Sequence, residues 1–503
     1  MRLTVRGNIK PYYVQMLLML FFPGAKFPEN ETPSPDVPEV TVTLEEQNDA
    51  VTAKAAVTLG DRTCKAEHTE KLTDSPSVFD NRHAKIVVGK AVFDCCRDLL
   101  GVTPPWGTLT GVRPAKVATE YLDSGMDRDA VVSVLTDKYC ASNTKASLAV
   151  DVALAEKRII TPRVREECSL YIAIPFCPSR CSYCSFVSYT SDRLLSMIPD
   201  YLTALADDIE VIFNAAAYVG QRISTVYIGG GTPTVLSEKQ LEFLLSHIEV
   251  LLGGNKLDEF TLEAGRPDTI TSEKLLIAKA HGVDRISVNT QTLNNDILRA
   301  IGRRHTAKDY YEAYDRAVRS GIRSINVDLI AGLPKESAES FSHSLDGIIA
   351  LAPQNITVHT FSVKKSAEIR ENDVSPYDAD GVVAGEAVAY SQSALSSSGY
   401  PPYYMYRQKN TVGNLENVGY ARPGYEGLYN VYMMEEVQSI FAAGASAVTK
   451  LVSLPDSAGK VKLKRIFQPK YPYEYLKEHG KQTKDERLRR LIADTAAFYR
   501  EFR

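Results

Sequence analysis

The chain has 503 residues, more than the roughly 250–300 that one hydrophobic core usually supports, so at least two domains are expected. Hydrophobic residues make up 44%, charged residues 24%, and the net charge is -4, as in ordinary globular proteins. This balance argues against a general nucleic-acid or membrane-surface binder, although it is compatible with a local basic patch. We therefore expect no nucleic-acid partner.

The first domain is predicted over residues 1–160 as an α/β domain. An apolar run over residues 14–22 follows three basic residues, as in a signal peptide. The run is too short to span a bilayer, and Lys26 stands where a cleavage site would require a small residue. We predict a buried helix there, after a strand over residues 3–5, with a targeting or membrane role as the alternative. Hairpin strands are expected over 39–44 and 50–58, and helices over 89–100 and 116–156. The domain contains no recognisable catalytic constellation, so its role is left open.

The middle of the chain, residues 161–365, alternates short β-rich runs with helical stretches. This pattern indicates βαβ units and a parallel sheet, with polar residues at the carboxyl ends of the strands. Six units instead of eight predict a partial (β/α)6 barrel, open at one side. The expected strands are residues 169–174, 224–228, 259–263, 285–289, 324–328 and 355–359.

The remaining residues, 366–503, have a less regular pattern. Residues 386–397 and 431–441 are predicted to be helical, and residues 461–466 to form a strand. We expect a mixed α+β region that closes the active site.

Three cysteines, Cys177, Cys181 and Cys184, directly follow the first predicted barrel strand. The C-x3-C-x2-C spacing lets three thiolates converge on one iron–sulfur cluster and leaves one iron for a non-protein ligand. Cys168 lies at the other end of the strand and should point away. The alternatives are packed core cysteines or a structural zinc site, but zinc needs a fourth ligand, and none follows nearby in the sequence. Eight cysteines are also too few for a disulfide scaffold, and reduced thiols suit a cytoplasmic location.

Polar and glycine-rich residues end the later barrel strands. Gly230, Gly231 and Thr232 form a turn at which a ligand can approach the backbone closely, with an ordinary tight turn as the alternative. Glu263 can accept hydrogen bonds from ribose hydroxyls or an amine, or can serve as a helix cap. Arg303 is a candidate partner for a carboxylate.

Together these motifs resemble the radical S-adenosylmethionine (SAM) superfamily and, within it, the oxygen-independent coproporphyrinogen III oxidase family. The match covers about residues 165–470. It includes IPFC, which ends at Cys177, and then GGGTPT, RISVNTQ, IGRRH and NVDLIAGLP in the same order. A Leu-Thr-Gly-Val-Arg-Pro string at residues 109–114 is most similar to the Z-type branch of coproporphyrinogen dehydrogenases.

The resemblance implies a 4Fe–4S cluster on Cys177, Cys181 and Cys184, and reductive cleavage of SAM. It also implies oxidative decarboxylation of coproporphyrinogen III to protoporphyrinogen IX in haem biosynthesis, with a tetrapyrrole substrate and an unidentified electron donor. The positions that match SAM contacts are Tyr171, Gly230, Gly231, Thr232 and Glu263. Those that match a second SAM molecule are Gln291, Arg303, Asp328 and Ser362.

Two departures from the family pattern affect the expected substrate. Ser185 and Phe186 follow the last cysteine, where the oxidases have a Gly-Cys pair. Residues 410–420 lack the His-Asn-x-x-Tyr-Trp motif of the related haem-trafficking branch. The alternatives are therefore the same chemistry on another tetrapyrrole or an unknown substrate, and a haem-binding or haem-delivery protein.

A substrate with four carboxylates requires basic side chains near an apolar surface. The sequence offers four such cations close to three tyrosines, although each could equally be a solvated loop charge. These residues are Lys364, Lys365, Arg407, Lys409, Tyr403, Tyr404 and Tyr406.

Overall fold

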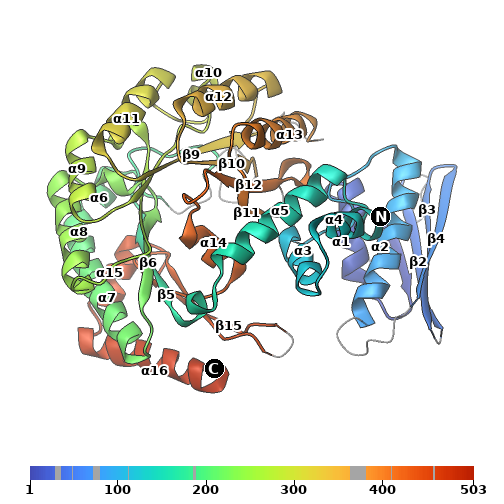
Figure 1. Cartoon of the computed structure of the whole chain (residues 1–503), viewed down its shortest axis with the longest axis horizontal. Coiled ribbons are helices and arrows are strands. Elements are labelled where there is room, and N and C mark those ends of the chain that lie inside the picture. Colours follow the sequence, from blue (N-terminus) through green and yellow to red (C-terminus); the bar gives the residue numbers. More distant parts are fainter. Residues whose placement is uncertain are drawn as a thin grey trace. The chain divides into compact units, whose positions relative to one another are not determined.

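The chain folds into two compact units, Met1–Leu154 and Ala155–Arg503 (Figure 1). The structure is a computed structural model. It describes residues 1–28, 36–47, 49–71, 80–111, 113–184, 188–362, 381–408, 411–456 and 459–502.

The first unit is a four-stranded sheet packed on helices. The sheet order is β1-β2-β3-β4, with β1 parallel to β2 and the other pairs antiparallel. The predicted apolar helix is α1, which buries Val14, Leu17, Leu18 and Phe21 in the core that the sheet shares with α2. The elements are β1 (Arg2–Arg6), α1 (Pro11–Phe21), β2 (Glu39–Gln47), β3 (Ala50–Leu59), β4 (Arg62–Lys71), α2 (Asp80–Leu100), α3 (Pro114–Asp123), α4 (Arg128–Tyr139) and α5 (Asn143–Ile159), whose end lies in the second unit.

None of the helices in the described part of the chain is both long and apolar enough to cross a membrane. The strand β4 was not predicted, because charged and polar residues occupy most of its positions and leave little hydrophobic pattern. It completes the sheet by pairing along its whole length with β3.

The second unit contains the predicted α/β architecture. Strands β5 to β10 agree with the six predicted strands to within a few residues, and helices lie along the outer side of the sheet (Figure 1). Its elements up to the sixth strand are η1 (Pro162–Glu166), β5 (Cys168–Ile174), α6 (Asp192–Leu195), α7 (Ile198–Tyr218), β6 (Ile223–Gly230), η2 (Pro233–Val235), α8 (Glu238–Leu252), β7 (Glu259–Gly265), η3 (Pro267–Thr269), α9 (Ser272–Ala280), β8 (Arg285–Val288), α10 (Asn295–Ala300), α11 (Ala307–Ser320), β9 (Ser324–Ala331), α12 (Ala338–Leu351) and β10 (Asn355–Thr360).

Later elements extend this sheet at both edges. The order is β11-β12-β10-β9-β8-β7-β6-β5-β13-β14-β15, in which β5 to β10 and β13 are parallel. Within the described residues, β11 and β15 pair with no further strand, so hydrogen bonds do not close the sheet there. The later elements are α13 (Val382–Ser397), β11 (Pro402–Arg407), η5 (Val412–Asn414), β12 (Glu416–Ala421), α14 (Leu428–Glu435), β13 (Ser439–Ala443), β14 (Val448–Val452), β15 (Leu463–Phe467), α15 (Pro472–His479) and α16 (Lys484–Phe502).

One predicted helix, over residues 431–441, is wrong in its second half. The helix α14 ends at Glu435, and the next residue, Glu436, caps it with a left-handed backbone of φ 53°. Residues Ser439–Ala443 then form β13, which is buried along its whole length and pairs in parallel with β5. A short run buried on both faces has no alternating pattern, so the sequence alone did not distinguish it from a continuing helix.

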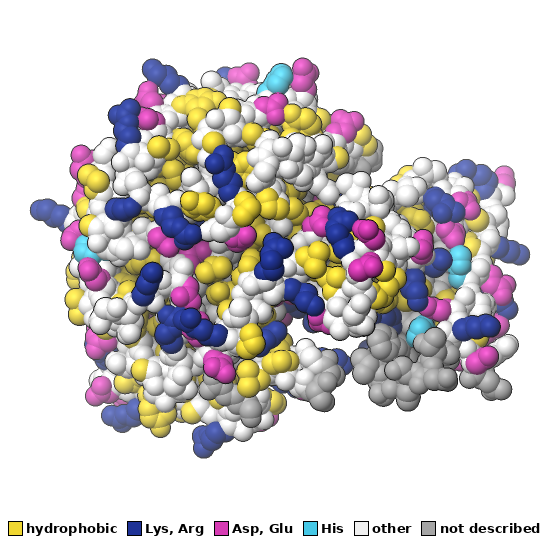
Figure 2. All heavy atoms as spheres, in the orientation of Figure 1, with side chains coloured by type: hydrophobic (Ala, Val, Ile, Leu, Met, Phe, Trp, Pro, Cys, Tyr) yellow, Lys and Arg dark blue, Asp and Glu magenta, His cyan; other side chains and the backbone are white. Residues whose placement is uncertain are grey.

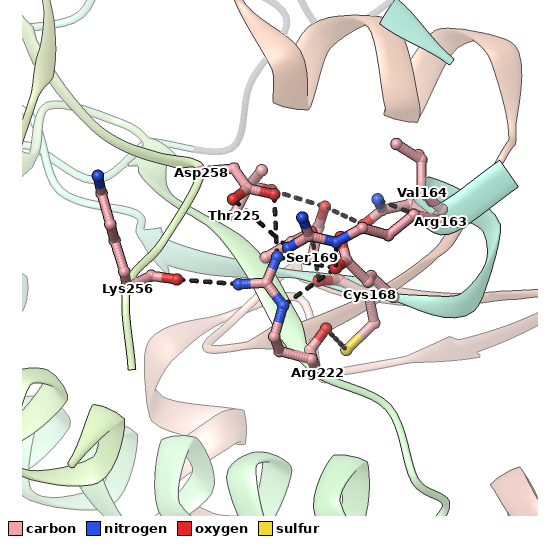
Figure 3. Close-up of polar contacts among 11 residues, drawn as sticks. Arg163, Val164, Cys168, Ser169, Arg222, Thr225, Lys256 and Asp258 are labelled. Carbon is pink, nitrogen blue, oxygen red and sulfur yellow. Dashed lines mark hydrogen bonds and ion pairs between the residues drawn. The ribbon is translucent and has the colours of Figure 1, made fainter. Parts of the chain in front are cut away.

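At the amino ends of β5, β6 and β7, one arginine joins the three strands (Figure 3). The guanidinium of Arg222 donates to the carboxylate of Glu167 at 2.8 and 3.0 Å and to Asp258 at 3.0 Å. It also donates to the backbone carbonyl of Lys256 at 2.9 Å. Cys168, as predicted, lies here rather than at the carboxyl end, and its thiol donates to the carbonyl of Arg222.

We predict that Arg222→Met lowers the free energy of unfolding of the cluster-free chain by about 2 kcal/mol, because the buried Glu167 and the partly exposed Asp258 lose charged hydrogen bonds. Urea unfolding followed by circular dichroism measures this difference. Arg299→Met is the matched control, since its ion pair with Asp296 is exposed and should contribute less than about 0.5 kcal/mol. Equal effects of the two substitutions would contradict a special role for Arg222.

Candidate functional site

The three cysteines lie on the loop that follows β5 at the carboxyl end of the parallel sheet. Cys177 and Cys181 are buried, and Cys184 is partly exposed. The backbone N–H of Cys177 donates to Tyr189 at 3.1 Å, and that of Cys184 donates to Cys181 at 3.1 Å. The three thiols therefore belong to one folded loop. Residues 185–187, which include the two departures from the family pattern, lie outside the described residues.

The glycine turn after β6 packs directly on this loop. Gly231 N–H donates to Ile174 at 2.8 Å, and Thr232 N–H donates to Phe176 at 2.8 Å. A Cβ on Gly231 would lie 2.5 Å from the carbonyl oxygen of Phe176, so only glycine fits. The hydroxyl of Thr232 is 3.3 Å from the Cys177 sulfur. The predicted turn and the predicted cysteine loop are thus adjacent.

An arginine that the sequence did not single out also contacts the cysteine loop. Arg266, just after β7, is buried and pairs with Asp268 at 3.1 Å. Its guanidinium donates to Ser179 at 2.8 Å and lies 3.9 Å from the Cys181 sulfur. A buried cation beside these sulfurs would stabilise the negative charge of a cluster bound to them. In the sequence, Arg266 is marked only by its place in an Arg-Pro string after Glu263. That string does not by itself predict a contact with the cysteine loop.

The second group of predicted residues surrounds Glu263. Its carboxylate accepts a hydrogen bond from Tyr227, which the sequence did not identify, and lies against Gly229, where a side chain would leave no room. Tyr171 stacks on Tyr227 with ring centroids 6.1 Å apart, and its hydroxyl lies beside Gly230. Burial, reinforced by the negative charge of Asp328, raises the pKa of Glu263 to about 7 in spite of the Tyr227 hydrogen bond.

The helix α14 closes the inner side of this group. Tyr429 stacks on Tyr227 with centroids 4.5 Å apart. The N–H groups of Leu428 and Tyr429 donate to the buried carboxylate of Glu259 at 2.7 and 3.2 Å, which caps the helix. Tyr429 comes from a helix about 200 residues after β6, so no local sequence signal could have placed it.

The third group contains Gln291, Arg303 and Asp328. Gln291 has a left-handed backbone with φ 73°, and two backbone hydrogen bonds of 3.0 Å hold it between Asp328 and Ile330. Arg303 donates to the carbonyl of Asn289 at 2.9 Å, and the side chain of Asn289 accepts from Asp328 N–H at 3.1 Å. A strained non-glycine residue held by its neighbours is typical of a ligand site.

This third group is linked to the cysteine loop and to Glu263. Arg303 donates to the hydroxyl of Tyr183, which lies between two of the cysteines, at 3.0 Å. Burial opposes ionisation of Asp328, but the imidazole of His359, 3.7 Å away, outweighs it and lowers the pKa of Asp328. Glu263 and Asp328 lie close enough for their charges to repel. All three groups therefore belong to one region of the barrel.

The remaining candidates from the sequence belong to β10, β11 and the segments next to them. Ser362 is just past β10, where it forms a backbone bridge with Thr411. Tyr403 lies at the amino end of the barrel, where its hydroxyl accepts from Asn355 at 3.1 Å, and so it is remote from the cysteine loop. Arg407 is buried, and burial lowers its pKa to about 10 although Glu416 is nearby. Lys364, Lys365 and Lys409 lie outside the described residues.

The arrangement fits a cluster with a polar ligand. Among the described residues, no three His, Cys, Asp and Glu side chains lie together as ligands of a single metal ion, so the zinc alternative finds no ligand set there. Each thiolate of a cubane cluster binds a different iron, so its cysteines lie farther apart than ligands of one ion. The buried Gln291 Oε1, Arg303 Nε and Ser182 Oγ lack hydrogen-bond partners within the described chain. A polar ligand would satisfy them.

The comparisons with known proteins agree with this class of site. Residues 171–347 match the Radical SAM superfamily. The chain is 36% identical over 398 residues to the oxygen-independent coproporphyrinogen-III oxidase-like protein HemZ of Bacillus subtilis, covering 78% of each chain. The chain therefore belongs to the oxygen-independent coproporphyrinogen-III oxidase-like family.

Two further relatives and one solved structure match a smaller part of the chain. The heme chaperone HemW of Bacillus subtilis is 39% identical over 198 residues, covering 39% of this chain and 51% of that protein. HemW of Escherichia coli is 30% identical, covering 52% and 65%. The structure of coproporphyrinogen III oxidase (HemN) from Escherichia coli has a TM-score of 0.49 and 23% identity, covering 66% of this chain and 72% of that one.

We predict that Gly231→Ala destabilises the cluster-free chain by about 1–3 kcal/mol and lowers its iron and sulfide content after reconstitution, since the added Cβ displaces the cysteine loop. Iron and sulfide assays and urea unfolding provide the measurements. The control is Gly385→Ala in α13, where nothing lies within 4 Å and alanine favours the helix. Wild-type cluster content in Gly231→Ala would contradict the packing described above.

A second prediction concerns the pH dependence of stability. Because the pKa of Glu263 is about 7 when folded and 4.5 otherwise, the folded chain binds more protons between these values. The contribution of this group to stability is therefore present below pH 4.5 and is lost as the pH rises to 7. Glu263→Gln should remove this loss and stabilise the cluster-free chain by up to about 3 kcal/mol at pH 8. Urea unfolding at pH 5 and pH 8 tests this. If the free energy of unfolding changed equally between pH 5 and pH 8 in Glu263→Gln and in the unaltered chain, the prediction would be contradicted.

Proposed function

We propose that this chain is a radical SAM enzyme that oxidatively decarboxylates the propionates of coproporphyrinogen III. The observation that carries the proposal is the arrangement of polar side chains inside the barrel. Strands β5, β6, β7, β9 and β10 each place one partly exposed side chain there among buried neighbours. These residues are Tyr171, Tyr227, Glu263, Asp328 and His359.

In this proposal, Cys177, Cys181 and Cys184 hold a 4Fe–4S cluster. The cluster and SAM, when bound, supply one-electron reductive cleavage that starts radical chemistry. Thr232 and Arg266 stabilise negative charge on the sulfurs, because each presents a donor to one of them. We propose that the backbone of the glycine turn binds the methionyl end of SAM, since this turn packs directly on the cysteine loop.

Glu263 is proposed to bind SAM through its amine or ribose hydroxyls. Tyr227 fixes the orientation of the Glu263 carboxylate by its hydrogen bond. The stacked rings of Tyr171 and Tyr429 exclude water from the side of the carboxylate that faces them. A cationic amine would bring the pKa of Glu263 back down, so ligand binding would relieve the unfavourable burial of its charge. Gln291, Arg303 and Asp328 offer a second polar binding region, which we propose for a second SAM molecule together with Ser362.

The overall reaction balances for each propionate. One hydrogen atom would pass from the β-carbon of the propionate to the 5′-deoxyadenosyl radical that SAM cleavage supplies. Carbon dioxide would then depart to give a vinyl group, and the one electron released would pass to a one-electron acceptor, which the reaction requires for each propionate. Two rounds convert coproporphyrinogen III to protoporphyrinogen IX. The polar barrel interior suits binding of the cofactor, and Lys364 and Lys365 remain proposed partners for the substrate carboxylates.

The decisive experiment is anaerobic turnover with reconstituted protein, dithionite, SAM and coproporphyrinogen III. We expect two 5′-deoxyadenosine and two carbon dioxide molecules for each protoporphyrinogen IX. Asp328→Asn should lower kcat/KM by about 30- to 100-fold, since it removes a charged hydrogen-bond partner of a bound ligand. Asp315→Asn on the exposed face of α11 is the charge-matched control and should be neutral.

Other outcomes would support the alternatives. Deoxyadenosine without a vinyl product would contradict the proposed substrate and indicate the same chemistry on another tetrapyrrole or an unknown substrate. A stable Soret band with haem, and no SAM cleavage, would favour the haem-delivery alternative that the names of the HemW relatives suggest.

A further inference from the structure

The most basic stretch of the chain, residues 460–490, is unrelated to the site described above. It contains eleven lysines and arginines against four acidic residues, although the whole chain has a net charge of -4. We call it the basic segment. It comprises β15, α15 and the first part of α16. The basic residues are Lys460, Lys462, Lys464, Arg465, Lys470, Lys477, Lys481, Lys484, Arg487, Arg489 and Arg490, and the acidic ones are Glu474, Glu478, Asp485 and Glu486.

The elements of the basic segment surround one cavity of about 450 Å³ against α7. Figure 1 shows α15 and α16 beside α7. Apolar side chains are exposed on the same segment, since Phe467 is 71% and Tyr473 is 49% accessible. The lining residues that matter here are Phe467, Tyr475, His479, Arg487 and Arg490.

A line of aromatic rings connects this cavity with the cysteine loop. Phe176 directly precedes Cys177, and its ring is 5.2 Å from that of Tyr201 on α7. The Tyr201 ring is 5.3 Å from that of Tyr475, which lines the cavity. Two ring contacts therefore separate the cavity from the residue next to the first cysteine.

A second line of rings reaches the same segment. Tyr189, whose carbonyl accepts from the Cys177 N–H, lies 5.9 Å from Tyr471, and Tyr471 lies 5.3 Å from the exposed Tyr473. Two separate series of ring contacts thus connect the cysteine loop with the basic segment. Only a few side chains therefore separate the cysteine loop from the protein surface at this segment.

We propose that the basic segment is the docking surface for a small acidic electron-carrier protein. This inference rests on the proposed function, in which the cluster needs one electron for each SAM cleaved. The step is a one-electron transfer, in which the carrier is oxidised by one electron and the cluster on the three cysteines is reduced by one. No proton or covalent bond is involved.

Charge and surroundings favour this partner over nucleic acid. Five cations of the basic segment pair with carboxylates, namely Lys464, Arg465, Lys481, Lys484 and Arg487. The other six are exposed, and exposed cations speed association with an acidic protein and orient it. Lys477 and Arg490 form no ion pair among the described residues, so their charge is available to a partner. The cations would also attract nucleic acid. A nucleic-acid partner, however, would not explain why the aromatic contacts lead to the cysteine loop.

The test compares two triple charge reversals in the full chain. The docking variant carries Lys470→Glu, Lys477→Glu and Arg490→Glu. The control carries Lys239→Glu, Lys308→Glu and Arg319→Glu, which change the net charge equally on α8 and α11, where Lys308 and Arg319 are 84% and 78% exposed. Circular dichroism and thermal unfolding check that both variants fold.

The first readout is binding of an acidic flavodoxin to the cluster-free chain by titration calorimetry or surface plasmon resonance. We expect the docking variant to bind at least about tenfold more weakly than the control variant, and binding by the unaltered chain to weaken as salt is raised. Equal affinities of the two variants, or binding that salt does not affect, would overturn the proposal. Tight binding of a transfer RNA to the basic segment without flavodoxin binding would also overturn it.

The second readout separates this inference from the proposed function. With reconstituted protein, reduced flavodoxin should reduce the cluster at least about tenfold more slowly in the docking variant, followed by the loss of visible absorbance. Dithionite is small and needs no docking surface, so it should support equal deoxyadenosine formation in both variants. No deoxyadenosine with dithionite would contradict the proposed function. Normal dithionite activity with equal flavodoxin rates would contradict only the docking surface.

Discussion

The two backbone hydrogen bonds from Gly231 and Thr232 to Ile174 and Phe176 are the contacts on which the rest of the site depends. They join the turn after β6 to the loop after β5, and they require a residue without a side chain at position 231. Because β5 and β6 are paired in parallel, both loops emerge at the same edge of the sheet. The position of Cys177 is therefore set by strand pairing rather than by the cysteine loop alone.

Opposite ends of the barrel have different roles. At the amino end, the charged side chains of Arg222 and the buried Glu259 form hydrogen bonds with other groups of the protein, as structural residues do. At the carboxyl end, Gln291 is strained and its buried side-chain oxygen has no hydrogen-bond partner among the described residues, and Glu263 has a raised pKa. A strained residue with an unsatisfied oxygen, close to a carboxylate of raised pKa, is typical of a site built for a ligand.

The sequence predicted features that depend on short stretches of chain. The barrel strands were short apolar runs with polar residues at their ends, and the cysteines and Glu263 belong to local motifs. Contacts between distant elements could not be predicted. Nothing near residue 429 indicates that Tyr429 stacks on Tyr227, and residues 439–443 form a strand only because the edge of β5 is available for pairing. The left-handed backbone of Gln291 likewise depends on hydrogen bonds with β9.

The helix α14 and the strand β13 are part of the site rather than an addition to a finished barrel. The strand β13 occupies the edge of β5, and α14 supplies the ring beneath Glu263. The hydroxyl of Tyr201 donates to Ala173 and accepts from Ala445, which ties the end of β5 to the loop after β13. The β5 strand that leads to the cysteine loop is therefore held from both sides, by β6 and by β13. A six-stranded barrel without these elements would leave an unpaired strand edge next to its most reactive loop, and the chain avoids this by adding a parallel seventh strand there.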